Sequence, residues 1–468
     1  MMFNKNQIYN YFSELNCNDS KIVYLFYFLP IALLAGNLII NITTLLISFF
    51  FIFELVQKKR VEFILNKKFF YLILIFVYLV LNTIFFSENK IDSIEKFNKA
   101  GLISALGFLR FVFLAFALSY YFNIDNNKYE RKIFHFWKLI FYVVTFDIIF
   151  ELFFGFNTIG FSGEELYHHR IASFTGDELI IGGFYYGFIL ITLSSILKNN
   201  GKAFYLYLIL FLVTSFVIGE KSNYLRVFFI TSLFLFFVST LRIKKILIST
   251  ILFALVIIST VNFNQSLRES FLGDLPLFKQ SRNIFHAIYP NLVTNADAAK
   301  VGSFFNHITQ NRHIKHQLTA YEMFQSSKFF GIGLKNFRNW GNNKKYNTIN
   351  SNIAMKYNGE TPLSGMGGST HPHQFHMQLL SELGLVGYIL ILILLIYYIK
   401  NGFTGFKIFN DYRPLIGALF LISTILPIFP SGSFFSTYNA TIFWVNFSLI
   451  LKYLMKDFFK ENSSHQKR

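Results

Sequence analysis

Three histidines lie within six residues of the chain, and together they could supply a proton acceptor. His371, His373 and His376 stand directly before a long apolar run, and Pro372 separates the first two. Proline favours the first position of a helix, and the Ser-Thr pair at 369–370 offers side chains that could cap it. We therefore expect His373 to lie in the first turn of a helix, beside unpaired backbone N–H groups. An imidazole there is biased toward its neutral form, which can act as a general base, and the same helix end attracts anions.

Four cations in other segments could hold such an anion. Arg170 opens the segment RIASFTGDELIIGG, Lys221 and Arg226 belong to GEKSNYLR, and Arg312 begins RHIKHQLTAYEMFQ. Arginine can grip a phosphate through two parallel hydrogen bonds, whereas lysine offers a point charge. Each of these residues also has a plainer interpretation, because cations at a membrane interface often only extend toward water.

Ionisable residues inside apolar runs form a second group. Arg110, Asp147 and Glu151 are costly in a bilayer, so they indicate either a function or a structural pair. Asp147 and Glu151 are one helical turn apart, on one face. Arg110 could pair with one of them or contact a substrate, and both interpretations stay open.

The histidine stretch resembles the signature of a known family. Residues 370–387, THPHQFHMQLLSELGLVG, are similar to the THPHN-x-x-LQLLSELGLxG pattern of O-antigen ligases and Wzy-type O-antigen polymerases. The matching positions are His373, Gln378, Leu380, Glu382, Gly384 and Gly387. Gln374 replaces the usual asparagine. Two further matches are an arginine-led helix with a glycine turn, at Arg312, Gly331, Gly333 and Phe337, and the PSGSFF turn at 430–435.

The resemblance implies an enzyme that moves a glycan from undecaprenyl diphosphate to a sugar hydroxyl. His373 would be the catalytic base, with neither a metal nor a cofactor. The implied substrate-binding residues are Arg312, Arg170, Lys221, Arg226 and, as a further candidate, Arg110. The acceptor would be another lipid-linked glycan in a polymerase, or lipid A–core in a ligase, and a chain-length regulator is a candidate partner.

The composition indicates the setting in which these residues must work. Of the 468 residues, 53% are hydrophobic and 20% are aromatic, a composition that is typical of membrane proteins and not of soluble domains. The net charge of +18 does not point to nucleic acid, because much of it lies in short loops that flank apolar runs. Cys17 is the single cysteine, so an internal disulfide is excluded.

The apolar runs predict an all-α polytopic integral membrane protein with about twelve transmembrane helices. The long run at 22–56 splits at Gly36-Asn37 into the first two spans. The others lie near 69–86, 102–122, 133–154, 179–197, 203–219, 224–241, 245–262, 385–400, 414–430 and 438–455. The chain then divides into spans one to nine (1–262), a large loop with short helices (263–375), and spans ten to twelve with a cytoplasmic tail (376–468).

Lysine and arginine set the predicted orientation. They concentrate at 58–60, 128–132, 198–202, 242–245 and 400–413, in loops that follow even-numbered spans and should therefore be cytoplasmic. The large loop then faces the periplasm of a bacterial inner membrane, together with the five segments that carry Arg170, Lys221 and Arg226, Arg312, His373 and Ser431. A transporter or flippase for lipid-linked oligosaccharide is the alternative. Transporters place polar sites near the midplane and often show an internal repeat, whereas here the polar groups crowd the outer end.

Overall fold

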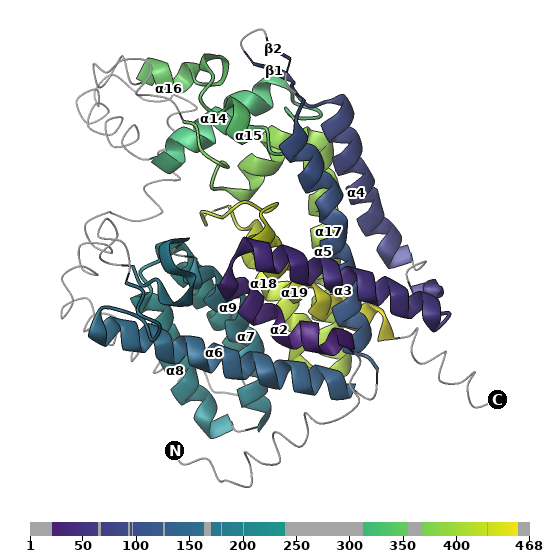
Figure 1. Ribbon diagram of the computed structural model, residues 1–468, viewed down its shortest axis with the longest axis vertical. Coiled ribbons are helices and arrows are strands. Elements are labelled where there is room, and N and C mark those ends of the chain that lie inside the picture. The colour runs from purple at the N-terminus through teal and green to yellow at the C-terminus, as the bar shows by residue number, and fades with distance from the viewer. Residues whose placement is uncertain are drawn as a thin grey trace.

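Long helices form a bundle, and a smaller group of helices lies at one end of it (Figure 1). The computed structural model describes residues 21–63, 67–91, 94–95, 97–124, 127–162, 170–178, 180–199, 201–238, 312–353, 367–427 and 429–456. The bundle helices are α2 (Lys21–Ala35), α3 (Asn37–Gln57), α4 (Lys67–Phe85), α5 (Lys99–Tyr121), α6 (Lys128–Phe154), α7 (Ile181–Asn199), α8 (Gly201–Val217), α9 (Lys221–Val238), α17 (Phe375–Phe409), α18 (Tyr412–Ile425) and α19 (Thr437–Leu454).

The group at the end of the bundle, which we name the cap, comes from residues 312–353. It contains α14 (Arg312–Ser326), α15 (Phe337–Trp340), the 3-10 turn η8 (Lys344–Tyr346) and α16 (Thr348–Ile353). Two further 3-10 turns, η1 (Val61–Phe63) and η4 (Ser173–Glu178), lie outside the cap. Beside the cap, the connection from α4 to α5 forms a short antiparallel ladder of β1 (Lys90–Ile91) and β2 (Ile94–Glu95), in which Lys90 pairs with Glu95 (Figure 1). The segment expected to carry short helices therefore does so where it is described.

Every predicted span except the ninth coincides with a helix. The first break was also correct, because Gly36 separates α2 from α3 with φ 100°, a conformation that favours glycine. The ninth span, 245–262, and the loop residues 263–311 and 354–366 lie outside the described residues, so the count of twelve and the placement of the loop stay predictions.

Six helices are long and apolar enough to cross a membrane by length and composition, in the part of the chain that the structure describes. They are α3, α5, α6, α7, α9 and α17, and α2, α4, α8 and α18 are shorter apolar helices. Large apolar side chains point away from the bundle, such as Leu38, Ile103 and Phe236, each at least 70% exposed. Because such side chains are costly in water, these features indicate a multi-pass membrane protein.

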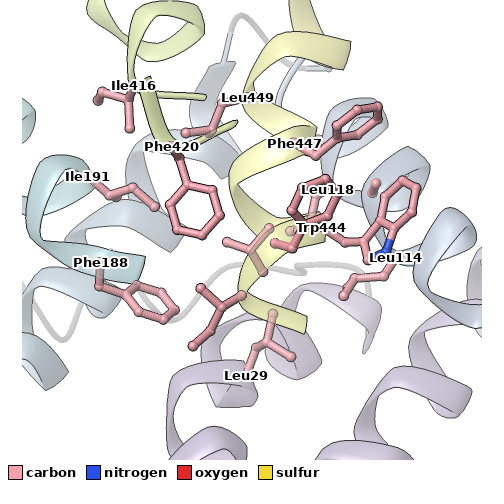
Figure 2. Close-up of a cluster of buried hydrophobic side chains, with 14 of the residues drawn as sticks. Leu29, Leu114, Leu118, Phe188, Ile191, Ile416, Phe420, Trp444, Phe447 and Leu449 are labelled. Carbon is pink, nitrogen blue, oxygen red and sulfur yellow. The ribbon is translucent and has the colours of Figure 1, made fainter. Parts of the chain in front are cut away.

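Helix α19 is the centre of the bundle. It buries fifteen of its 18 residues, so it has neighbours on all sides. Figure 2 shows this core, to which α19 contributes Trp444, Phe447 and Leu449. The labelled side chains around it are Leu29 of α2, Leu114 and Leu118 of α5, Phe188 and Ile191 of α7, and Ile416 and Phe420 of α18. This packing fixes the start of α19 and hence the turn before it, residues 429–436.

A break in α17 joins the bundle to the cap. Gly384 has φ 67° and ψ −170°, a conformation that is strongly unfavourable for other residues. The loop after α14 packs into the break, where the Ile332 N–H donates to the Ser381 carbonyl (2.9 Å) and the Leu385 N–H donates to the Lys328 carbonyl (2.8 Å). The predicted span began at residue 385, immediately after this break. Because the helix changes direction at Gly384, the residues before the break can point toward the cap.

Candidate active site

Four histidine rings meet between α14 and the segment that precedes α17. The His373 ring lies 4.0 Å from that of His371, 4.8 Å from that of His313 and 5.4 Å from that of His316, measured between centroids. We name these four residues the histidine cluster. Among the residues that the structure describes, no three His, Cys, Asp or Glu side chains are arranged to hold a metal ion.

The predicted position of His373 in the first turn of a helix is wrong. Helix α17 begins at Phe375, and its cap is Gln374, whose side chain accepts a hydrogen bond from the Met377 N–H (2.6 Å). His373 precedes the cap with φ 56°, in the left-handed region that few residues other than glycine adopt. The Ser431 N–H donates to its carbonyl (2.8 Å), which helps to hold this conformation. Strained backbone of this kind gathers at functional sites.

The Ser-Thr pair that was expected to cap the helix contacts the histidines instead. Thr370 Oγ1 lies 2.9 Å from His371 Nδ1, and Ser369 Oγ lies 3.3 Å from His373 Nε2. His371 Nε2 lies 3.3 Å from the Ser431 carbonyl, which can only accept, so this nitrogen carries the hydrogen. The Nδ1 atom of His371 then accepts from Thr370, and the ring is satisfied as a neutral imidazole.

The cluster is held in its neutral form. The pKa of His373 is lowered to about 2, first by burial and then by repulsion from the three neighbouring histidines. Burial also lowers the pKa of His371 to about 4, although its contact with Ser431 acts in the opposite direction. The neutral state was predicted, but its main cause is burial and not the end of a helix.

His376, the second residue of α17, does not belong to the cluster. Its Nε2 atom donates to the Ile425 carbonyl at the end of α18 (2.6 Å), and its Nδ1 atom lies 3.0 Å from the Tyr388 hydroxyl. Both nitrogens are therefore used in joining α17 to α18, and the residue has a structural role.

Arg170 and Arg226 are brought together around Glu220, at the turn between α8 and α9. Arg170 Nη2 forms an ion pair with Glu220 Oε1 (2.6 Å), and Arg226 Nη2 donates to the Pro430 carbonyl (2.7 Å). The side chain of Glu220 is only 8% exposed. Lys221 follows it as the first residue of α9 and is half-buried. An incoming anion would therefore have to compete with a carboxylate for Arg170.

The turn before α19 links this group to the histidine cluster. Arg226 contacts the turn at Pro430, and the next residue, Ser431, binds His371 and His373. The segments around 170, 220–226, 313–316, 371–373 and 430–433 thus form a chain of contacts under the cap. The loop charges predicted that these segments share the outer face of the membrane; the structure brings the five segments to one end of the bundle, and the side of the membrane stays a prediction.

Arg312 stands at the edge of the cluster. It is the first residue of α14, its side chain is exposed, and its charge contributes to the lowered pKa of His316, for which burial is the main cause. Of the predicted cations, it is the one placed next to the histidines and open to a ligand.

Arg110 does not pair with Asp147 or Glu151, so the structural pair considered for it is wrong. Its Nη2 atom donates to Asn41 Oδ1 (2.8 Å) in α3. Glu151 accepts hydrogen bonds from the backbone N–H groups of residues 172–173 (2.9 and 2.6 Å), and Asp147 binds the same loop. Glu151 thus accepts from backbone donors of the neighbouring loop and Asp147 accepts from the Ser173 hydroxyl, whereas Arg110 donates to Asn41 and to the Gly107 carbonyl. No substrate contact of Arg110 follows from these bonds.

Sequence reasoning missed four residues of this region. Glu220 lies inside a segment that was singled out only for its cations, and Lys335 lies inside the matched glycine turn, 3.5 Å through its Nζ atom from Ser433 Oγ. His313 and His316 are one turn apart in a predicted helix, and this spacing beside Arg312 was the available signal.

Comparison with known proteins agrees with the signature at the histidines. The family model for O-antigen ligase matches residues 206–392, a range that includes Arg226, the cap, the histidine cluster and the break at Gly384. No curated protein matches the chain. Over residues 206–392, the chain is therefore similar to the O-antigen ligase family.

Proposed function

We propose that this protein transfers a glycan from undecaprenyl diphosphate to a sugar hydroxyl, on the periplasmic face of a bacterial inner membrane. The family domain supports a function of the O-antigen ligase or polymerase type in surface polysaccharide biosynthesis. The observation that carries the proposal is the histidine cluster around His373, with Arg312 beside His316 and Arg226 on the adjoining Pro430 turn, at one end of an apolar bundle. This arrangement suits a lipid diphosphate, whose tail needs the bilayer and whose anion needs cations at its edge.

His373 acts as the general base on the acceptor. Its neutral imidazole takes the proton of the hydroxyl while the hydroxyl oxygen attacks the anomeric carbon of the donor glycan. The bond from that carbon to the diphosphate oxygen breaks, and undecaprenyl diphosphate leaves with the electron pair. A pKa of about 2 keeps the empty site unprotonated. A bound diphosphate raises this pKa, because a nearby negative charge favours the imidazolium.

Cations around the cluster stabilise the leaving diphosphate. Arg312 is exposed beside His316 and needs no rearrangement to receive a phosphate oxygen. Arg226 and Lys221 support the same end of the site through the Pro430 turn and the start of α9. Arg170 contributes by exchanging part of its contact with Glu220 for the ligand.

A polymerase and a ligase share this chemistry and differ in the acceptor. A polymerase accepts a second lipid-linked glycan and works with a chain-length regulator, whereas a ligase accepts lipid A–core. A flippase for the same lipid is less consistent with the site, since its polar groups lie at one end of the bundle and not at its middle.

Transfer by the purified wild-type protein tests the proposal. With undecaprenyl-diphosphate glycan as donor, and with lipid A–core or a second lipid-linked glycan as acceptor, we expect product with one of the two acceptors. Product should form in the presence of a chelator, since none of the proposed steps uses a metal ion. Absence of product with both acceptors, from protein that is folded and monodisperse, would contradict the proposed function.

Arg312 should matter mainly for use of the donor. Arg312→Ala removes a charge-assisted hydrogen bond to phosphate, which is worth about 1.5–3 kcal/mol, so kcat/KM for the donor should fall roughly 10- to 150-fold. Arg312→Lys should restore only part of this loss, because the guanidinium fork is absent. Steady-state kinetics at equal protein abundance provide the measurement. Arg131→Ala, an exposed arginine near the start of α6 at the far end of the bundle, is the matched control. An Arg312→Ala variant with wild-type donor kinetics would remove the residue from the site.

A further inference from the structure

Lys335 lies next to the histidine cluster and has no part in the mechanism above. In the described part of the chain, the one hydrogen bond of its side chain joins Nζ to Ser433 Oγ, at the long distance of 3.5 Å, whereas its backbone N–H donates to the carboxylate of Glu382. A lysine ammonium carries three donors and is normally hydrated or paired when it is covered. Burial lowers the pKa of Lys335, and the charge of Glu382 offsets part of this effect. The Lys335 ammonium therefore has N–H donors that could bind a ligand.

The backbone at Lys335 is held in a conformation that costs free energy. Its φ is 61°, in the left-handed region that favours glycine. Its neighbours fix it there, because the Leu334 carbonyl accepts from Asn98 Nδ2 (2.7 Å) and Asn336 Nδ2 donates to Ser87 Oγ (2.9 Å). A lysine that only faced water would not offset the cost of this backbone conformation. Strain of this kind is common where a side chain must be directed at a ligand.

Ser433 is prepared to donate a hydrogen bond at the same place. Its Oγ atom accepts from Gln378 Nε2 (2.9 Å) and from Lys335 Nζ. The orientation of the Gln378 amide is set by the Phe434 N–H, which donates to Gln378 Oε1 (2.9 Å). Since two donors occupy the lone pairs of the hydroxyl, its own hydrogen is left to point toward a ligand.

This pair of donors borders the candidate base. The charge of Lys335 contributes to the lowered pKa of His371, after burial, and the His371 ring lies 4.0 Å from that of His373. Lys335 reaches the site from the glycine turn and Ser433 reaches it from the turn before α19. Both are separate from Arg312, which reaches it from the start of α14.

We propose that Lys335 and Ser433 form a subsite for an anionic oxygen beside His373, and that this oxygen belongs to the diphosphate of the lipid donor. The inference rests on the proposed function, because it assigns the subsite to that donor. An acidic group on the acceptor glycan would have the same chemistry, so the experiment must separate the two sources.

The test uses Lys335→Gly, Lys335→Arg and a control, Lys328→Ala, whose side chain is exposed in the same loop. Each purified full-length variant is titrated with undecaprenyl diphosphate, and KM is measured separately for donor and acceptor. Lys335→Gly should weaken undecaprenyl diphosphate binding on the order of 10- to 100-fold, whereas Lys335→Arg should weaken it less and Lys328→Ala should not change it. Glycine accepts the left-handed backbone without cost, so the Tm of Lys335→Gly should be equal to that of wild type or higher.

Other results overturn the inference. A Lys335→Gly variant that binds undecaprenyl diphosphate like the wild type and still transfers glycan would refute the subsite and leave the proposed function standing. A rise in KM for the acceptor alone would assign the anion to the acceptor and refute the donor assignment. A fall in both Tm and binding would show a structural lysine. If the wild type neither binds nor transfers, the proposed function fails and the inference fails with it.

Discussion

His373→Ala should abolish detectable product while the protein remains folded and membrane-inserted. A general base contributes about 10²- to 10⁴-fold to the rate, and His373 is the ring at the centre of the cluster. Its loss should appear in kcat, because the imidazole acts on the acceptor hydroxyl during the chemical step. Single-turnover transfer from purified donor is the measurement. Turnover near the wild-type level would remove His373 from the role of base.

His376→Ala is the matched control for this prediction. Its nitrogens bind Ile425 and Tyr388, so its removal should destabilise the junction of α17 and α18 by about 1–3 kcal/mol. Turnover per folded molecule should stay near that of the wild type. His371→Ala should also retain much of the activity, since this ring donates to the Ser431 carbonyl and is satisfied without a substrate.

The pH dependence of glycan transfer should reflect the lowered pKa of His373. The pKa of His373 is about 2 in the empty site, so kcat/KM should show no loss from its protonation between roughly pH 5 and 8. The profile of kcat reports the complex instead, and there the bound diphosphate raises the pKa, so a fall on the acid side should appear first in kcat. The acid limb of kcat would be attributed to another group if it persisted unchanged in the residual activity of His373→Ala.

The helical bundle could be predicted from the sequence because hydrophobic runs report directly on contact with lipid. The break at Gly36 and the start of the tenth span at 385 were both marked by glycine. Helix ends were predicted less well. Helix α17 continues to Phe409, well past the predicted end at 400, although this stretch contains Gly402 and Gly405; both are buried closely against Pro414 of α18, so packing and not helix propensity extends the helix. Hydropathy therefore gives the part of a helix that meets the bilayer and not its full length.

The site could be predicted only where it is contiguous in sequence. The signature located His373, but the rings of His313 and His316 come from a segment about sixty residues away. The position of His373 outside the helix depends on Gln374, a residue type that sequence statistics do not favour as a cap. The choice of partners by ionisable groups is a tertiary property, and for this reason the pairing considered for Arg110 was wrong and the carboxylate beside Arg170 was missed.

The second large effect that we expect is a loss of stability in Arg170→Ala, because Glu220 loses its ion-pair partner. The side chain of Glu220 is 8% exposed and its Oε1 atom lies 2.6 Å from Arg170 Nη2. Removal of the arginine leaves a covered negative charge without its ion-pair partner, and breaking a buried pair in this way costs about 3–5 kcal/mol. Because Arg170 is itself 27% exposed, we expect the lower end of this range.

A double-mutant cycle separates this structural role from binding of the diphosphate. Arg170→Ala/Glu220→Gln removes the unpaired carboxylate and leaves buried Arg226 bonded to the Pro430 carbonyl, so it should recover part of the Tm that Arg170→Ala loses. Donor KM should remain raised in the double variant, since the proposed phosphate contact is still missing. Lys345→Ala is the matched control, because it breaks an ion pair of the same 2.6 Å length with Glu88 that is 53% and 26% exposed. An exposed pair contributes about 0–1 kcal/mol, so the Tm of this control should hardly change. If the double variant recovered both Tm and donor KM, Arg170 would act only by neutralising Glu220 and would have no contact with the diphosphate.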